Sequence, residues 1–315
     1  MDNIKIVFAG LDSAGKTSFL NTMEEKYSTL MNIKPTLGAD RRQFKIFGFT
    51  VSNWDLGGQK TYRDTYLDEK DRYFTNISTL FYIFDIQDES RADEAFLYFK
   101  LILEALEQFN EQPKIIFCWH KFDADLKKEK TCREQVARYE QRLSNLTGKR
   151  FFPVTFKTSI FDKWSLLKAF SEGIIGLSPK KAFINSQLKD FARRTFSSAV
   201  LLLDPNYLLI GSSTHDEALL EVCEAIVPYA SEMASNLDRY DINTENIVVS
   251  LKPGDYYRDV LEGKELVSQF IPLNIDGTSF SLLSLTKNPR TLKLMLRHGG
   301  KLASNLKDLL KTLYF

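Results

Sequence analysis

Largely apolar runs alternate with polar, helix-patterned stretches along the first half of the chain. Four runs predict strands, at residues 4–9, 79–85, 114–119 and 151–156, and those at 79–85 and 114–119 are predicted to be buried. Apolar positions at helical spacing predict helices at residues 18–23, 94–109 and 164–175, and the charged residues 66–73 predict an exposed helix. Residues 44–47 and 49–54 alternate around Gly48, which predicts a β-hairpin. This order is typical of an α/β domain with a mostly parallel sheet, whose ligand loops follow the carboxyl ends of the strands.

The order of elements changes at residues 176–179, where Gly, Ser and Pro cluster. This break predicts a boundary between a domain of residues 1–176 and a domain of residues 177–315. We expect the second domain to run helix, two strands, helix, three strands, helix, at residues 182–194, 196–203, 207–211, 214–236, 246–251, 267–275, 278–285 and 288–315. Thr214-His215-Asp216-Glu217 matches a capping box that would start the central helix. Asp276-Gly277 is a strong hairpin signal.

The strongest chemical signal lies between the first strand and the first helix. Gly10-Leu11-Asp12-Ser13-Ala14-Gly15-Lys16-Thr17 has the spacing G-x-x-x-x-G-K-T of a P-loop. Its glycines allow a tight turn in which successive backbone N–H groups point at an anion. Lys16 can reach the β- and γ-phosphates, and the Thr17 hydroxyl can hold Mg²⁺. The residues predicted to bind phosphate here are Asp12, Ser13, Ala14, Gly15, Lys16, Thr17 and Ser18.

A later strand ends in Asp55-Leu56-Gly57-Gly58-Gln59, a group suited to sense the γ-phosphate. Asp55 can hold Mg²⁺ through water, and Gly57 or Gly58 can donate a backbone N–H to the γ-phosphate. Gln59 can orient the attacking water, so Gln59 and Lys16 are the predicted catalytic residues. Thr36 lies in a loop that can order with the nucleotide, and its hydroxyl can complete the metal shell. The predicted Mg²⁺ ligands are therefore Thr17, Thr36 and Asp55.

Residues that can read a base follow the next strands. His120-Lys121-Phe122-Asp123 comes directly after a buried strand. The Asp123 carboxylate can accept hydrogen bonds from the N1–H and N2–H₂ groups of guanine, a donor pair that adenine lacks. Lys121 can lay its aliphatic stem over the base plane. The backbone of Ser159 and Ile160 can contact the guanine carbonyl oxygen, so the predicted nucleotide is GTP or GDP.

Composition limits the other classes of function. Apolar residues make up 43% of the 315 residues, and the net charge of +1 gives no reason to expect a nucleic-acid partner. The three cysteines predict reduced, buried thiols rather than a disulfide framework, and hence a cytoplasmic protein. We expect no signal peptide, no membrane-spanning helix and, since Asp2 follows Met1, no N-myristoylation. Any place at a membrane would then depend on a partner.

Together these motifs resemble the Ras-type small GTPases. The P-loop, Pro35-Thr36-Leu37-Gly38 and Trp54-Asp55-Leu56-Gly57-Gly58-Gln59 look like the Arf and Arf-like family. His120-Lys121-Phe122-Asp123 is similar to the Rag/Gtr family, as is Phe156-Lys157-Thr158-Ser159-Ile160-Phe161-Asp162. In most small GTPases an asparagine stands where this chain has His120, and it braces the P-loop to the base-binding loop. No arginine is obviously placed to act as a finger in cis, so we expect slow hydrolysis that a partner accelerates.

The second domain resembles a roadblock/longin-type (profilin-like) module in its order of elements alone. Rag-family GTPases carry such a module after the G domain, which implies dimerisation with a second copy or a related GTPase, together with GTPase-activating and exchange proteins. An Arf-like trafficking GTPase and a nucleotide-bound scaffold without significant hydrolysis are the alternatives, and a merely structural α+β domain is another for the second half. His215 and His298 lack partners at metal-ligand spacing and are expected at the surface or at a helix cap.

Overall fold

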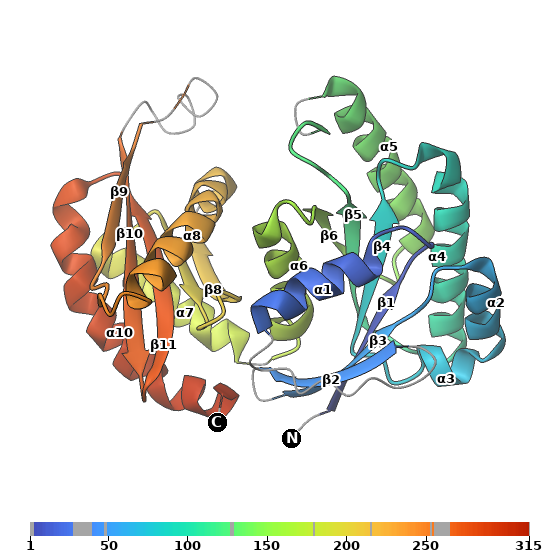
Figure 1. The fold of residues 1–315 in the computed structure, drawn as a ribbon, viewed down its shortest axis with the longest axis horizontal. Helices are drawn as coiled ribbons and strands as arrows, with labels where there is room; N and C mark the ends of the chain where they lie inside the picture. Colours follow the sequence, from blue (N-terminus) through green and yellow to red (C-terminus); the bar gives the residue numbers. More distant parts are fainter. Residues whose placement is uncertain are drawn as a thin grey trace. The chain divides into compact units, whose positions relative to one another are not determined.

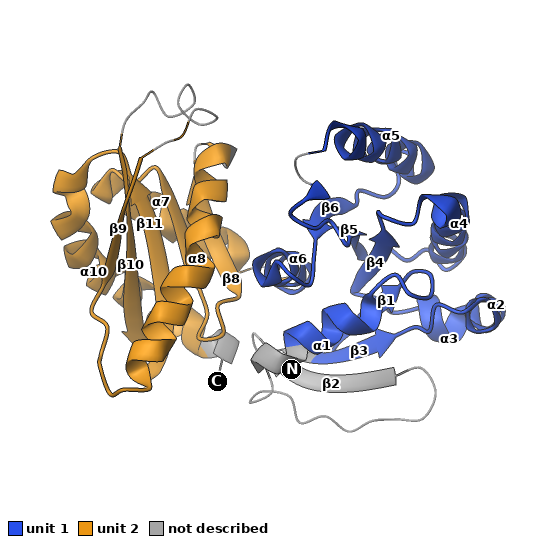
Figure 2. Ribbon diagram, turned by 45° about the horizontal axis from the view of Figure 1, so that its top comes forward, with its two compact units in different colours: residues 1–177 blue, residues 178–315 orange. Residues whose placement is uncertain are grey.

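We describe a computed structural model of the protein, covering residues 3–27, 40–46, 49–126, 129–178, 180–214, 216–252, 254 and 265–314. The chain divides into two compact units, Met1–Leu177 and Ser178–Phe315 (Figure 1, Figure 2). Both are α/β units, which confirms the predicted fold class. Among the described residues, no helix is long and apolar enough to span a membrane.

The first unit is built on a six-stranded sheet of order β2-β3-β1-β4-β5-β6. β2 pairs with β3 antiparallel, and the other described pairs are parallel. The strands are β1 Asn3–Ala9, β2 Asp40–Ile46, β3 Phe49–Asp55, β4 Thr79–Asp85, β5 Lys114–His120 and β6 Val154–Thr158. The helices are α1 Lys16–Tyr27, α2 Lys60–Asp68, α3 Lys70–Phe74, the 3-10 turn η1 Glu89–Arg91, α4 Ala92–Gln108, α5 Lys130–Thr147 and α6 Lys163–Ile175.

Aromatic side chains hold the helices to both faces of this sheet. α1 and α6 cover one face of the sheet (Figure 1). On this face Phe8 stacks on Phe81 with ring centroids 4.5 Å apart. On the face covered by α4, the Tyr82 ring lies 4.7 Å from the Phe99 ring and 5.3 Å from the Phe117 ring. Burying one such ring stabilises the fold by roughly 1.5–3 kcal/mol. The sheet is therefore a rigid platform for the loops at its edge.

The strand register gathers these loops at one edge. Asp55 at the end of β3 pairs with Phe8 of β1, and Asp85 at the end of β4 pairs with His120 of β5. His120 in turn pairs with Thr158, the last residue of β6. The loops that follow β1, β3, β4, β5 and β6 thus leave the sheet at the same side, where α/β proteins bind ligands.

Residues 60–74 differ from the expected exposed helix. The segment forms α2 and α3, which are separated at Glu69, where φ is −99° and ψ is 44°. Tyr66 and Tyr73 are buried, and their rings lie 4.6 Å apart. The prediction of exposure was wrong because charged residues in this segment flank an aromatic face that packs on the core.

Two further elements of the first unit depart from expectation. The strand predicted for residues 151–156 begins only at Val154, since Pro153 has no N–H to donate to the β5–β6 ladder. α5 was not predicted, although its buried positions Cys132, Val136 and Leu143 have helical spacing. The predicted hairpin of residues 44–54 appears as the antiparallel β2–β3 pair, and its turn at Gly48 lies outside the described residues.

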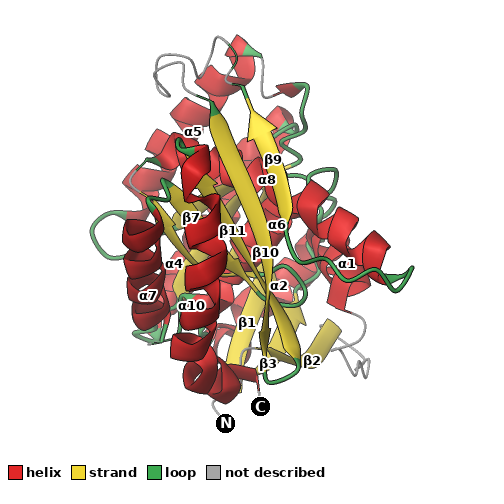
Figure 3. Ribbon diagram, turned by 90° about the vertical axis from the view of Figure 1, so that its left-hand side faces the viewer, coloured by secondary structure: helices red, strands yellow, loops and turns green. Residues whose placement is uncertain are grey.

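The second unit has a five-stranded antiparallel sheet of order β8-β7-β11-β10-β9. α7 and α10 cover one face of this sheet, and α8 covers the other (Figure 1, Figure 3). The strands are β7 Ala199–Leu203, β8 Leu209–Thr214, β9 Ile247–Leu251, β10 Leu266–Ile275 and β11 Thr278–Thr286. The helices are α7 Lys181–Thr195, α8 Glu217–Asp238, the 3-10 turn η3 Pro289–Thr291 and α10 Leu292–Tyr314.

Local backbone chemistry explains the boundaries in this unit. The Asp276-Gly277 turn joins β10 to β11 as predicted, and both residues have positive φ, at 50° and 83°. The strand expected from residue 196 starts at Ala199, because Phe196 ends α7 with a left-handed φ of 54°. The expected capping box at Thr214 was wrong: the N-cap of α8 is Asp216, whose carboxylate accepts the Ala218 N–H at 2.9 Å. α8 continues through Pro228.

Candidate functional site

The P-loop follows β1 and has the backbone of an anion cradle. Gly10 and Gly15 have φ of 147° and 97°, and Ser13 has φ of 61°. A side chain at Gly10 would collide with the backbone of Ile83 in β4. The glycine is therefore required by close packing as well as by its conformation. The predicted phosphate-binding residues lie in this turn and in the first turn of α1.

Lys16 folds back over its own loop. Its Nζ donates to the carbonyl oxygens of Gly10 at 3.1 Å and Leu11 at 2.7 Å. The side chain is buried, and this burial lowers its pKa to about 8, against the opposing pull of Asp55 and Asp12. A buried ammonium with two carbonyl partners can still donate a third hydrogen bond. A phosphate oxygen is the natural acceptor, and its negative charge would raise the lysine pKa again.

The first two predicted metal ligands meet directly. The Thr17 hydroxyl donates to Asp55 Oδ2 at 2.9 Å, although 38 residues separate the two. A hydroxyl and a carboxylate are hard oxygen donors of the kind Mg²⁺ prefers, so this pair fits the ion. Thr36, the third predicted ligand, lies outside the described residues.

The glycines after β3 lie against the P-loop. A side chain at Gly58 would collide with the backbone of Leu11 and Asp12. The Gly57 N–H donates to the Tyr66 hydroxyl at 3.0 Å, which ties this turn to α2. Gln59 is the N-cap of α2 and its side chain is exposed. The structure thus brings Gly58 to the P-loop and leaves the Gln59 amide free to turn.

The base loop after β5 is held by two neighbouring strands. Asp123 accepts the Ser159 hydroxyl at 2.5 Å on Oδ1 and the Gln87 amide at 3.0 Å on Oδ2. Gln87 Nε2 also donates to the Lys121 carbonyl oxygen at 2.8 Å, and Lys121 Nζ forms an ion pair with Asp85 at 2.6 Å. Each Asp123 oxygen retains a lone pair, so the carboxylate is fixed in place and can still accept guanine donors. Ile160 follows Ser159 and is exposed.

His120 joins the base loop to the P-loop. Its Nδ1 lies 2.9 Å from Thr158 Oγ1, and a side chain on Gly15 would come within 2.5 Å of its ring. The ring is 1% exposed, and this burial lowers its pKa to about 4. His120 is therefore a neutral brace between β6 and the P-loop.

Sequence reasoning missed a chain of ion pairs beside the P-loop. Arg91 of η1 pairs with Asp12 at 2.7 Å and with Glu94 at 3.0 Å. Glu94 also pairs with Arg63 of α2, whose guanidinium lies over the Tyr98 ring. No arginine was expected to be placed as a finger in cis; Arg91 lies beside the P-loop, but both of its ion-pair partners, Asp12 and Glu94, belong to this chain. No spacing signal could have revealed it, because 79 residues separate Arg91 from Asp12.

Comparison with known proteins agrees with this geometry. The family model "Gtr1/RagA G protein conserved region" matches residues 5–230. The chain belongs to this Gtr1/RagA family. Its members are GTPases, so the chain binds guanine nucleotide and hydrolyses GTP. This confirms the Rag/Gtr resemblance seen in the sequence.

Individual relatives are distant. The chain is 27% identical to "GTP-binding protein gtr1" of Schizosaccharomyces pombe over 284 residues, which cover 88% of this chain and 82% of the relative. It is 28% identical to "Ras-related GTP-binding protein A" of Dictyostelium discoideum over 212 residues, covering 66% and 69%. Among solved structures, the Arl6 BBS3 small GTPase from Trypanosoma brucei with bound GppNp has a TM-score of 0.43 and 22% identity, covering 56% of this chain and 97% of that chain.

Proposed function

We propose that this Gtr1/RagA family member is a two-state switch that binds Mg²⁺–GTP, hydrolyses it slowly and dimerises through residues 177–315. The observation that carries the proposal is the meeting of the P-loop, the Thr17–Asp55 pair and Asp123 at one edge of the sheet. Separate loops from five strands then contact the phosphates, the metal and the base of one nucleotide. Loops of this kind change order when the γ-phosphate is lost.

Each predicted residue has one task in this proposal. Lys16 neutralises charge on the β- and γ-phosphates, and the Gly58 N–H holds the γ-phosphate. When bound, Mg²⁺ would neutralise phosphate charge, and Thr17 and Asp55 would hold it, joined by Thr36. Gln59 orients the attacking water. Asp123 selects guanine, and Lys121 covers the base.

Two observations support slow intrinsic hydrolysis. The Gln59 side chain is exposed and makes no capping hydrogen bond, so nothing in α2 fixes its amide toward a phosphate. Arg91 reaches the P-loop but is already bound to Asp12 and Glu94. An arginine that is doubly paired supplies little charge to a transition state. A GTPase-activating partner would hold the Gln59 amide in place and supply positive charge to the transition state.

The exposed residues of the second unit support dimerisation. Tyr229 and Met233 on α8 are 76% and 52% exposed, and Val248 on the edge strand β9 is 45% exposed. Exposed apolar side chains on a helix and the edge strand of a sheet are each common pairing surfaces for a second chain. The partner would be a second copy or a related GTPase. We also propose that the protein is cytoplasmic.

Hydrolysis and mass measurements test the proposal. Purified protein should turn over GTP slowly and ATP at no measurable rate, and Gln59→Leu should slow hydrolysis while GTP binding persists. Lys60→Leu, the adjacent exposed position, is the matched control and should leave the rate unchanged. Equal turnover of ATP would overturn the guanine assignment. Sedimentation of the full chain as a monomer, alone and with each related GTPase, would overturn dimerisation.

A further inference from the structure

Charge is distributed very unevenly over the second unit. α7 and α10 together contain nine Lys and Arg residues and two Asp residues, a net charge of +7. The whole chain has 42 basic and 41 acidic residues, so the remainder carries −6. α8, on the opposite face of the sheet, has five acidic residues and no basic ones. The sheet thus separates a basic face from an acidic one.

The basic residues lie on the outer surface of two adjacent helices. α7 and α10 pack side by side over the same sheet face (Figure 3). Their exposed cations include Lys189, Arg193, Arg194, Lys293, Arg297 and Lys301. Arg193 pairs with Asp190 within α7, whereas the other five form no ion pair with any described residue. These unpaired cations are available to an external anionic surface.

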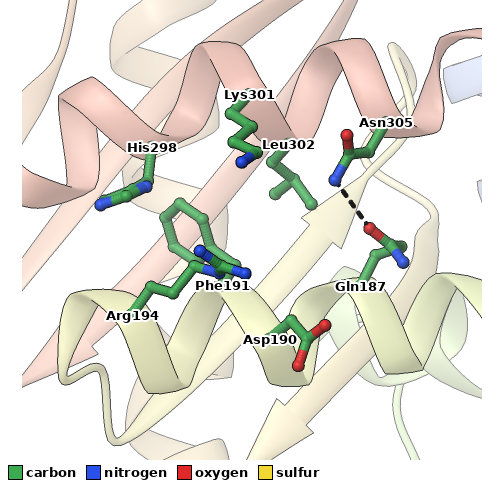
Figure 4. A pocket seen from close by; sticks show the side chains of 8 residues that line it. All are labelled: Gln187, Asp190, Phe191, Arg194, His298, Lys301, Leu302 and Asn305. Carbon is green, nitrogen blue, oxygen red and sulfur yellow. Dashed lines mark hydrogen bonds between the residues drawn. The ribbon is translucent and has the colours of Figure 1, made fainter.

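A shallow hollow lies between the two helices, at the centre of this face (Figure 4). Arg194, His298 and Lys301 stand at its rim, and Phe191 and Leu302 form its apolar floor. Its volume is about 40 Å³, room for a small polar group rather than for a peptide side chain or helix. Gln187 and Asn305 close one end with a hydrogen bond of 3.0 Å.

We propose that the α7–α10 face docks on an anionic lipid surface. The cations are spread over two helices and surround only a shallow hollow. A protein partner would find no pocket on this face deep enough for an anchoring side chain. Mobile lipid headgroups can instead gather under each cation separately. Phe183 on α7 and Leu296 on α10 are 47% and 43% exposed, and such apolar side chains insert at the headgroup boundary. The acidic α8 face then points away from the lipid.

Vesicle co-sedimentation of the full-length chain tests this proposal. The vesicles would be phosphatidylcholine with about 30% phosphatidylserine, and pure phosphatidylcholine for comparison. The test variant is Arg194→Ala/Arg297→Ala/Lys301→Ala. The matched control is Lys100→Ala/Lys130→Ala/Lys149→Ala, which removes three exposed cations from the first unit and changes net charge equally.

The proposal expects binding to the anionic vesicles alone, and loss of that binding as salt rises from about 0.1 M to about 0.5 M. Each cation near an anionic membrane contributes roughly fivefold in partitioning, so the triple variant should bind about a hundredfold more weakly. The control triple should bind within about twofold of the wild type, and all three proteins should bind GDP equally. Absence of binding to anionic vesicles, or equal loss in the control, would overturn the proposal and leave an acidic protein as the partner of this face. Phe183→Ser should weaken binding without changing its salt dependence.

Discussion

His120 predicts a specific loss of stability in mild acid. Its pKa is about 4 because burial disfavours the charged imidazolium, whereas an unfolded histidine titrates near 6.5. Below about pH 6.5 the unfolded chain binds a proton that the native ring does not. Stability is therefore fully present at neutral pH and is lost as the pH falls from about 6.5 to about 4. From these two values, moving from about pH 7 to about pH 5 costs the first unit about 2 kcal/mol.

The positions of the tryptophans and histidines allow the stability of the first unit to be measured separately. All three tryptophans, Trp54, Trp119 and Trp164, lie in the first unit, so tryptophan fluorescence during urea unfolding reports that unit alone. His120 is also the first unit's sole histidine, and no other side chain has an ordinary pKa between pH 5 and 8. The protein would be freed of nucleotide, because phosphate groups titrate in the same range.

His120→Asn is the matched variant, because its amide is polar but does not titrate. It should lower stability at neutral pH by leaving a small gap at Gly15, and its free energy of unfolding should then vary little between about pH 7 and about pH 5. The quantity compared between wild type and variant is the change in the free energy of unfolding with pH, not its absolute value. A wild-type change below about 0.5 kcal/mol, or the same slope in the variant, would refute the buried neutral brace.

Three other variants test the rest of the site. Gln87→Ala removes two donors that hold the base loop and should weaken GDP binding roughly tenfold, measured by nucleotide release, with little change in the GTP-to-GDP ratio. Asp123→Asn should shift preference from guanine toward xanthine nucleotides in competition binding; an unchanged preference would move the base site elsewhere. Glu94→Gln should slow GTP hydrolysis roughly tenfold while GDP affinity stays within about twofold, and equal losses in both would indicate general misfolding.

The sequence predicted those parts of the site whose chemistry depends on short spacing. Lys16 and Thr17 are recognisable because a phosphate cradle needs glycine, lysine and hydroxyl at fixed offsets. Asp123 follows from its place after a buried strand. Gln87 could not be assigned, since its role depends on a contact with Asp123 36 residues away. Its only signal was its position just beyond the end of β4, where ligand loops gather.

The element boundaries that failed have equally local causes. Pro153 cannot donate to a ladder, and Phe196 adopts a left-handed conformation that an apolar residue seldom takes. Both interrupt runs whose apolar composition favours a strand. Periodicity reports which residues are buried, but backbone donors and φ decide where a strand begins. Element type was therefore predictable here where exact limits were not.

The ion-pair chain gives a physical reason why the P-loop and α2 act together. Asp12 places a negative charge in the loop that must bind phosphate, and pairing with Arg91 cancels it and lowers the pKa of the Asp12 carboxyl. Glu94 then balances Arg91 and the buried Arg63, so the four charges sum to zero. Arg63 lies in the first turn of α2, where its backbone N–H donates to the Gln59 carbonyl oxygen at 3.0 Å.

The backbone position of Gln59 is thus linked through Arg63, Glu94 and Arg91 to Asp12 of the P-loop. A phosphate group bound in the P-loop would add negative charge close to Asp12. That charge would draw Arg91 away from Glu94, and Glu94 would then bind Arg63 alone. The nucleotide state would alter the support of α2 without any direct contact between α2 and the phosphate. The Gln59 amide, which nothing else in α2 restrains, is the part of the site most sensitive to that change.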